Sequence, residues 1–218
     1  MSAHWQQVYD TKAEDQTSWF RPHLDLSLQL VDGLGLAPFA PIIDVGAGRS
    51  TLVDDLIARG YRDLSVLDLS QSALEQAHAR LGRIGDGVHW IAGDVLAVDL
   101  PASHFSLWHD RALFHFLVEE DARRRYVARV HETLRPGGFA IVSTFASDGP
   151  ERCSGLPVRR YDADGLAEVF GNGFERISDH RELHRTPFDS VQPFTTLLLR
   201  RSDAAGTPTR TTPAGAMP

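Results

Sequence analysis

The sequence predicts an α/β domain built on a doubly wound, mostly parallel sheet. From Pro41 onward, apolar runs of strand length alternate with amphipathic segments of helix length. This alternation is typical of a parallel sheet that is covered by helices on both faces. The chain has 218 residues, of which 42% are hydrophobic, enough for one well-buried domain and too few for two full-sized ones.

The first two thirds of the chain give the parallel part of this sheet. A helix over residues 24–34 ends the N-terminal segment, and five strands follow. The predicted strands are residues 41–46, 64–69, 88–93, 105–110 and 139–145. Leu52, Val53 and Leu56 share one helical face between the first two strands, and Leu74, Ala77 and Leu81 do so between the next two.

The last third of the chain predicts one long helix, one short helix and a hairpin. The long helix spans about residues 118–134 and stops at the "RPGG" sequence, and its acidic residues precede arginines by four positions, which predicts exposed ion pairs. A short helix over 164–170 precedes strand-like runs at 174–184 and 194–200, an antiparallel hairpin at the sheet edge.

These elements divide the chain into three expected parts. They are an N-terminal lid and helix (1–38), the main domain (39–201) and a tail (202–218) that lacks apolar anchors and is expected to be disordered.

Composition excludes several classes of function. The net charge of -7 argues against a nucleic-acid or membrane-surface partner, which usually selects a basic protein. No signal segment or membrane-length apolar run is present, so we expect a cytoplasmic protein. Cys153 is the single cysteine, which excludes an internal disulfide and argues against a structural metal site.

A glycine turn follows the first strand in the sequence "DVGAGRST". A dinucleotide-binding turn requires a third glycine, where this chain has Thr51, and no lysine follows as a phosphate-binding loop requires. Asp44 stands two residues before Gly46, and a carboxylate there would repel phosphate but suits a ligand that carries an ammonium and a sulfonium group.

Two further carboxylates end the next strands. Asp68 closes the second strand, where it could accept hydrogen bonds from ribose hydroxyls, and Asp94 follows the third, where it could meet an adenine amino group with Val95 against the ring. The carboxyl ends of parallel strands converge on one crevice, so we expect these side chains to share a ligand.

The motifs "DVGAG", "VLDLS", "GDV", "FSLWHD" and "LRPGGFAIVSTF" resemble, in order and spacing, those of class I S-adenosylmethionine-dependent methyltransferases. The resemblance implies a Rossmann-like, doubly wound, seven-stranded sheet and S-adenosyl-L-methionine as cofactor. The cofactor-binding residues expected from the motifs are Asp44, Gly46, Ala47, Gly48, Asp68, Leu69, Asp94, Val95, His109 and Arg111.

The N-terminal segment extends the resemblance. "HWQQVYDTKAEDQTSW" is similar to the aromatic segment of the elongation-factor lysine methyltransferase branch and its bacterial relatives, which implies that Trp5, Tyr9 and Trp19 close over the cofactor. The sequence "RALFHFL" after the fourth strand departs from that branch, and Arg111 stands where those relatives have a lysine. Ordinary packing of an N-terminal helix is the alternative interpretation of the three aromatic residues.

The acceptor is expected to bind beyond the fourth and fifth strands. His115 is the predicted acid or base because imidazole exchanges a proton near neutral pH, and Arg111 could hold an anion. Further candidates are Asp110, Phe145, Cys153, Arg159, Arg160, Tyr161 and His184. We expect a small anionic acceptor and a monomer or homodimer; the alternatives are a protein-lysine methyltransferase and a non-catalytic cofactor-binding regulatory module.

Overall fold

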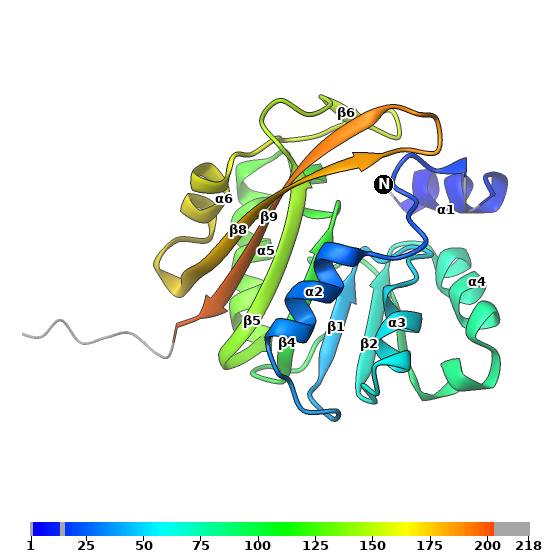
Figure 1. Ribbon diagram of the computed structural model, residues 1–218, viewed down its shortest axis with the longest axis horizontal. Helices are drawn as coiled ribbons and strands as arrows, with labels where there is room; N and C mark the ends of the chain where they lie inside the picture. The colour runs from blue at the N-terminus through cyan, green and yellow to red at the C-terminus, as the bar shows by residue number, and fades with distance from the viewer. Residues whose placement is uncertain (1, 14–15, 203–218) are drawn as a thin grey trace, which may run out of the picture.

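The computed structural model describes residues 2–13 and 16–202 and confirms the α/β architecture (Figure 1). The predicted disordered tail, apart from Ser202, lies outside the described residues. Within the described ranges, no helix is long and apolar enough to cross a membrane.

The sheet has seven strands in the order β3-β2-β1-β4-β5-β9-β8. Its strands are β1 (Ile42–Val45), β2 (Leu64–Asp68), β3 (His89–Ala92), β4 (Phe105–Arg111), β5 (Leu134–Phe145), β8 (Phe174–Arg185) and β9 (Val191–Arg201). Strands β1 to β5 pair in parallel, and β9 is antiparallel to both β5 and β8. The predicted antiparallel edge hairpin is therefore confirmed.

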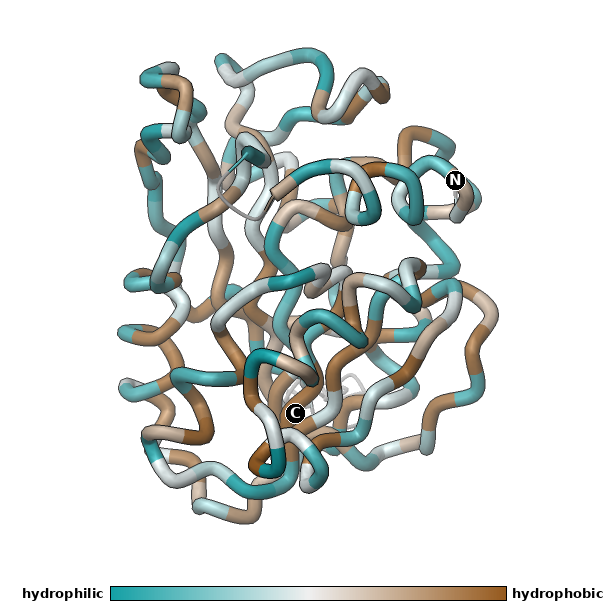
Figure 2. The backbone as a smooth tube through the Cα atoms, turned by 90° about the vertical axis from the view of Figure 1, so that its right-hand side faces the viewer, coloured by the Kyte–Doolittle hydropathy of each residue, from teal (hydrophilic) through white to brown (hydrophobic). Residues whose placement is uncertain are grey.

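Helices cover both faces of this sheet. They are α1 (Ser2–Thr11), α2 (Asp25–Gly33), α3 (Leu52–Ala58), α4 (Gln71–Leu81), α5 (Glu120–Thr133) and α6 (Ala163–Phe170), with 3-10 turns η2 (Gly82–Gly87), η3 (Phe114–Phe116) and η4 (Gly171–Gly173). One hydrophobic core contains residues of α2, α3 and α4, and a second contains residues of α5 and α6. Hydrophobic stretches accordingly run through the interior of the molecule (Figure 2).

Two strands or ladders differ from the sequence prediction. Strand β5 begins at Leu134, directly after α5, because Gly137 adopts a positive φ of 70° and a register shift between Phe105 and Leu107 absorbs the "RPGG" sequence. A two-stranded ladder, β6 (Arg152–Cys153) with β7 (Leu156–Pro157), lies in the predicted loop; strands this short carry no periodic pattern.

The predicted ion pairs along α5 are wrong. Arg123 is buried and donates to the carbonyls of Leu117 and Val118, and Arg125 donates to the carbonyl of Leu96. These backbone acceptors belong to the turn before α5 and to the segment after β3, which helical spacing cannot reveal. Arg124 pairs with Asp121, three residues earlier.

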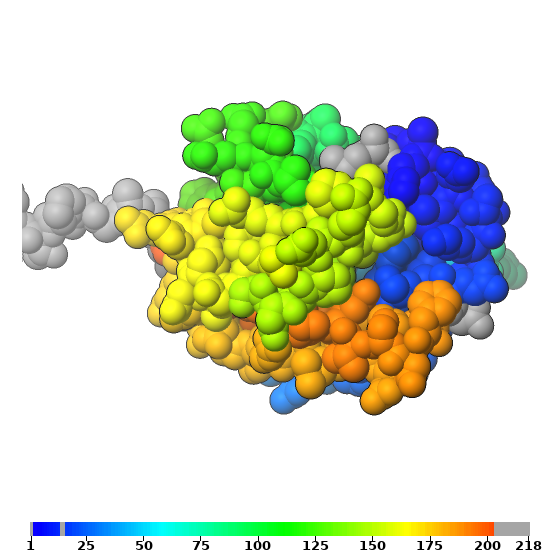
Figure 3. Space-filling view, turned by 90° about the horizontal axis from the view of Figure 1, so that it is seen from above, coloured from blue at the N-terminus to red at the C-terminus, as the bar shows by residue number. Residues whose placement is uncertain are grey.

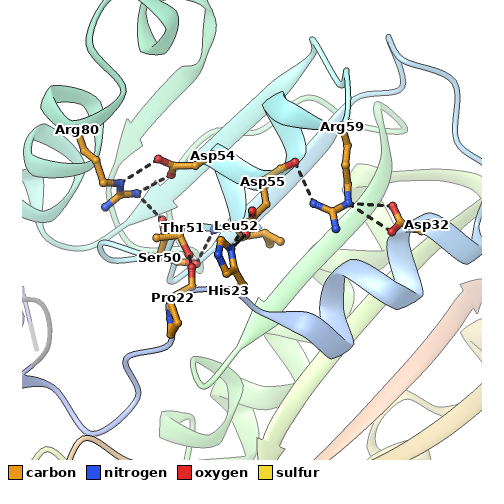
Figure 4. A network of polar contacts seen from close by, with 10 residues as sticks. All are labelled: Pro22, His23, Asp32, Ser50, Thr51, Leu52, Asp54, Asp55, Arg59 and Arg80. Atoms are coloured by element: carbon orange, nitrogen blue, oxygen red, sulfur yellow. Dashed lines mark hydrogen bonds and ion pairs between the residues drawn. The ribbon is translucent and has the colours of Figure 1, made fainter.

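The glycine turn between β1 and α3 requires its glycines. Gly46 and Gly48 have φ values of +64° and +54°, and a Cβ at Gly48 would lie 2.0 Å from the Tyr9 hydroxyl. Polar contacts fix the following helix (Figure 4). Thr51 donates to the carbonyl of Pro22 at 2.8 Å, and Arg80 donates to Asp54 and to the carbonyl of Ser50. The turn is thereby held against α4 and the segment before α2.

Candidate active site

A cavity of about 560 Å³ opens at the carboxyl ends of the parallel strands. We call its first side the strand wall; it consists of Gly46, Asp68, Leu69, Asp94 and Val95. The second side, the loop wall, consists of Trp19, Arg111, Phe116 and Cys153. The residues come from segments that the topology brings together, as expected for a ligand site in an open α/β sheet.

The strand wall is held by backbone hydrogen bonds. Asp68 accepts the N–H groups of Gly48 and Ser70, each at 2.8 Å, and its burial raises the pKa of the carboxyl to about 6. Asp94 is exposed and accepts the N–H of Leu96 at 2.9 Å. Leu69 and Val95 add apolar surface, so this wall could hold ribose hydroxyls and a planar base.

Asp44 lies in a buried polar chain at the bottom of the site. His109 Nδ1 is 2.7 Å from Asp44 Oδ1, and His109 Nε2 is 2.9 Å from the Ser27 hydroxyl. Asp44, Ala47 and His109 line a neighbouring cavity of about 50 Å³, which shares Gly46 and Arg111 with the large one. Gly48 lines neither cavity and acts through its bond to Asp68. Sequence reasoning did not identify Ser27, since an isolated helical serine carries no signal.

Helix α1 forms part of the cavity lining. Ser2, Trp5 and Tyr9 line the cavity; the Ser2 hydroxyl donates to the Leu69 carbonyl at 3.4 Å, and Gln76 donates to the Tyr9 carbonyl at 3.1 Å. Trp5 and Trp19 have ring centroids 5.7 Å apart. Seen from above the strand ends, the N-terminal segment lies beside the β6–β7 segment and the tip of the β8–β9 hairpin (Figure 3).

Arg111 stands at the junction of the two cavities. Its Nη1 donates to the Trp19 carbonyl at 3.3 Å, and its guanidinium carbon lies 4.5 Å from the Phe194 ring centroid. Nε and Nη2 are buried without a hydrogen-bond partner among the described residues. Burial, together with the nearby Arg21, lowers the pKa of Arg111 to about 10. The preceding Asp110 accepts the N–H groups of Leu113 and Phe114 and thereby fixes the turn that follows β4.

His115 does not reach the cavity. Its side chain is fully buried, its Nδ1 accepts the N–H of Phe145 at 3.4 Å, and its Nε2 has no partner among the described residues. Burial and the Arg111 charge lower its pKa to about 3, so it stays neutral at physiological pH. The apolar run "LFHFL" turns inward as η3, and the ring centroids of His115 and Phe145 are 4.6 Å apart. This placement argues against the predicted acid–base role.

The remaining acceptor candidates lie in different parts of the structure. Cys153 lines the large cavity, and burial raises its pKa to about 12, which favours the neutral thiol. Arg159, Arg160 and Tyr161 line a separate cavity between α5 and α6. His184 is buried, and its Nε2 bonds the Ser18 carbonyl at 2.7 Å. No group of three or more potential metal ligands occurs within residues 2–13 and 16–202.

The fold and the proteins to which this chain is similar support a class I S-adenosylmethionine-dependent methyltransferase, with S-adenosyl-L-methionine as cofactor. A family model described as "Methyltransferase domain" matches residues 42–138. The residues present suit the cofactor, because the buried Asp68, the exposed Asp94 and apolar side chains line one cavity of about 560 Å³ at the strand ends.

Two similar proteins are named for methylation of eEF1A. The chain is 22% identical over 180 residues to EEF1A lysine methyltransferase 2 of Danio rerio, covering 79% of this chain and 71% of that protein. It is 24% identical to an eEF1A lysine and N-terminal methyltransferase homolog of Drosophila pseudoobscura pseudoobscura, covering 62% of this chain but 21% of that protein, so it spans about a fifth of that relative.

Solved structures are also similar. Burkholderia thailandensis 1,6-didemethyltoxoflavin-N1-methyltransferase, with 1,6-didemethyltoxoflavin and S-adenosylhomocysteine bound, has a TM-score of 0.69 and 26% identity, covering 83% of this chain and 78% of that one. A structure concerned with converting a disulfide bond into a thioacetal group during echinomycin biosynthesis has a TM-score of 0.75 and 20% identity, covering 94% and 93%.

Proposed function

We propose that this methyltransferase acts on a small anionic acceptor bound at Arg111. The observation that carries the proposal is the pair of buried guanidinium nitrogens, Nε and Nη2, that have no partner among the described residues. A buried cation without a counter-charge is unfavourable, whereas a carboxylate matches the two parallel N–H groups of a guanidinium. An anionic group bound there would satisfy Arg111 and lie within the loop wall.

The lining of the large cavity supports an acceptor that is already deprotonated. No histidine is among the described residues that line the large cavity. The Cys153 thiol lies in the lining with a raised pKa, and the ionised Asp68 is bonded to two backbone N–H groups. A carboxylate, thiolate or enolate needs no base, so positioning supplies the main catalytic contribution.

The other residues then have distinct roles. We assign Asp44 to the cofactor's ammonium group, Asp68 to its ribose hydroxyls, and Asp94 with Val95 to its adenine. Trp5 and Trp19 exclude water from the cavity, which strengthens electrostatic interactions inside it. Bound S-adenosyl-L-methionine supplies the activated methyl group on its sulfonium.

The comparisons supply two candidate acceptor classes. The Burkholderia enzyme has a small heteroaromatic compound bound, which supports a small acceptor here. The name of the Danio rerio relative supports a protein lysine as the second candidate. Arg111 in the lining favours the first class, because a guanidinium repels a lysine ammonium. Cytoplasmic location, absence of a nucleic-acid partner and a monomeric or homodimeric state remain predictions.

One screen separates these classes. Methyl-labelled cofactor is incubated with the protein and either a panel of small carboxylic acids, thiols and phenols or a whole-cell protein extract. We expect label in small-molecule products, and less of it with Arg111→Met than with Cys153→Ala as the matched variant from the same wall. Label that appears on a protein band alone would overturn the proposal in favour of lysine methylation.

A further inference from the structure

We propose that Arg49 is a positioning residue that anchors helix α1 over the large cavity and thereby slows the release of the cofactor. The inference rests on the proposed place of the cofactor in that cavity and extends it to cofactor exchange. Arg49 stands in the glycine turn between β1 and α3, directly after Gly48, whose N–H donates to Asp68. One turn therefore contacts the strand wall through its backbone and α1 through a side chain.

The Arg49 side chain binds the residues that follow α1. It is 9% exposed, its Nη1 donates to the Lys12 carbonyl at 2.9 Å, and its Nη2 donates to the Ala13 carbonyl at 3.1 Å. A guanidinium only donates, so the direction of both bonds is fixed. The last turn of α1 has no basic residue of its own. A cation at the carboxyl end of a helix is favourable, and Arg49 supplies it from another part of the chain.

Gln76 on α4 joins the same contact. Arg49 Nη1 donates to Gln76 Oε1 at 2.9 Å, and Gln76 Nε2 donates to the Tyr9 carbonyl at 3.1 Å. The Tyr9 ring centroid lies 5.2 Å from the Arg49 guanidinium carbon. The end of α1 is therefore held both to α4 and to the glycine turn.

This anchoring bears on the cavity because residues of α1 line it, namely Ser2, Trp5 and Tyr9. At the first half of α1, the Ser70 hydroxyl donates to Gln6 Oε1 at 3.1 Å, a bond between neutral groups. Hydrogen bonds from a charged donor are stronger than neutral ones. Loss of Arg49 should therefore free the end of α1 and open that side of the cavity to solvent.

The test measures release of S-adenosylhomocysteine by stopped-flow tryptophan fluorescence, since Trp5 and Trp19 line the cavity. Arg49→Met keeps an unbranched side chain and removes every donor. We expect the dissociation rate constant to rise about tenfold, the scale of a lost hydrogen bond to a charged group, with association slowed by less than about twofold. An unchanged dissociation rate, or an affinity lost through slower association, would overturn the inference.

A second ligand distinguishes anchoring from direct binding, because Arg49 also lines the small cavity. 5′-Methylthioadenosine has the adenosine part of S-adenosylhomocysteine without its amino-acid group. In Arg49→Met, release of both ligands should accelerate by a similar factor, because α1 lines the cavity that holds the shared part. Acceleration confined to S-adenosylhomocysteine would show that Arg49 binds the ligand's carboxylate, and would overturn the inference.

Arg59→Met is the matched control. Arg59 follows α3, donates to Asp32 on α2 at 3.1 Å and lines neither the large nor the small cavity, so release should stay at the wild-type rate. Acceleration equal to that of Arg49→Met would contradict a specific role for Arg49. Gln76→Met covers an Arg49 variant that fails to fold. Its release should be about threefold faster, since it loses the bond to the Tyr9 carbonyl, and an unchanged rate would count against the inference.

Hydrogen exchange of the ligand-free protein tests the anchoring itself. In Arg49→Met we expect faster exchange over α1 and wild-type exchange over β1 and β4. Protection lost equally in α1 and β1 would show a general loosening of the fold and overturn the inference. Unchanged exchange in α1 would reject the role of Arg49 alone, whereas faster exchange in α1 with unchanged release would also reject the proposed place of the cofactor.

Discussion

The strand wall and the loop wall differ in how their polar groups are satisfied before any ligand binds. On the strand wall, Asp68 accepts two backbone N–H groups and Asp94 accepts one. On the loop wall, Arg111 has two buried nitrogens without a partner among the described residues. The first wall is therefore preorganised by the fold, while the second leaves a charge for a ligand to neutralise.

The two walls also differ in their origin. The strand wall comes from the end of β2 and from the turns that follow β1, β2 and β3, so the sheet itself sets its geometry. The loop wall comes from three separate segments, namely the segment around Trp19, the end of β4 with the following η3, and β6. Side chains of all three segments, Trp19, Phe116 and Cys153, pack in one hydrophobic cluster. If the strand wall binds the cofactor and the loop wall the acceptor, as we propose, cofactor binding depends on the fold and acceptor selection on individual side chains.

Replacing Arg111 on the loop wall should have the largest effect on activity. Arg111→Met removes the unpaired charge and keeps much of the apolar volume over Phe194. The transition state with the anionic acceptor should therefore lose about 2–5 kcal/mol of stabilisation, which is measured as a lower kcat/KM. S-adenosylhomocysteine affinity should change far less. Steady-state kinetics and calorimetry measure the two effects, and an equal loss in both would place Arg111 in the cofactor site instead.

Replacing Asp68 on the strand wall should instead weaken cofactor binding. Asp68→Ala removes a proposed acceptor of ribose hydroxyls, which should weaken S-adenosylhomocysteine binding by about 1.5–3 kcal/mol. Calorimetry checks this value, with Asp99→Ala as an exposed control that lines no part of the cavity. Unchanged affinity in Asp68→Ala would mean that the ribose binds elsewhere.

The fold was predictable because its signals are local. Alternating apolar segments, the glycine turn and the carboxylates at the strand ends lie where a parallel sheet requires them. The structure places Gly46, Asp68 and Asp94 in the lining of the large cavity. Asp44 lies beside the small cavity instead, bonded to His109.

The remainder depended on contacts that no spacing encodes. His115 followed a strand end as a catalytic residue would, yet η3 turns it into the core. Ser27 and Phe116 gave no signal, because their contacts are with partners far away in the sequence. Ser27 contacts His109, 82 residues away, and Phe116 contacts Trp5 on α1.

Adding one methyl group tests whether α1 and the glycine turn form a single unit. Gly48→Ala places a Cβ 2.0 Å from the Tyr9 hydroxyl at a φ of +54°. We expect cofactor binding to weaken by about 1–2 kcal/mol, from left-handed strain and displacement of Tyr9. The double variant Gly48→Ala/Tyr9→Phe removes the clashing oxygen and should recover part of that loss in calorimetry. No recovery would exclude the hydroxyl oxygen as the cause and leave the backbone strain and the Tyr9 ring carbon, which lies 2.7 Å from the added Cβ.

The smallest expected effect is a pH dependence confined to the strand wall. Burial raises the pKa of Asp68 to about 6, and ribose hydroxyls donate to its ionised form. The affinity of the wild-type protein for S-adenosylhomocysteine should therefore be greatest above that pKa and fall as the pH decreases through it, by about fourfold at half a unit below. Calorimetry in buffers of different ionisation enthalpy should detect proton release on binding near pH 6, because the ligand favours the carboxylate. Asp68→Asn cannot titrate, so its affinity should be lower and independent of pH over the same range. An equal fall with pH in Asp68→Asn would assign the titration to another group and remove the link between the burial of Asp68 and the binding of ribose.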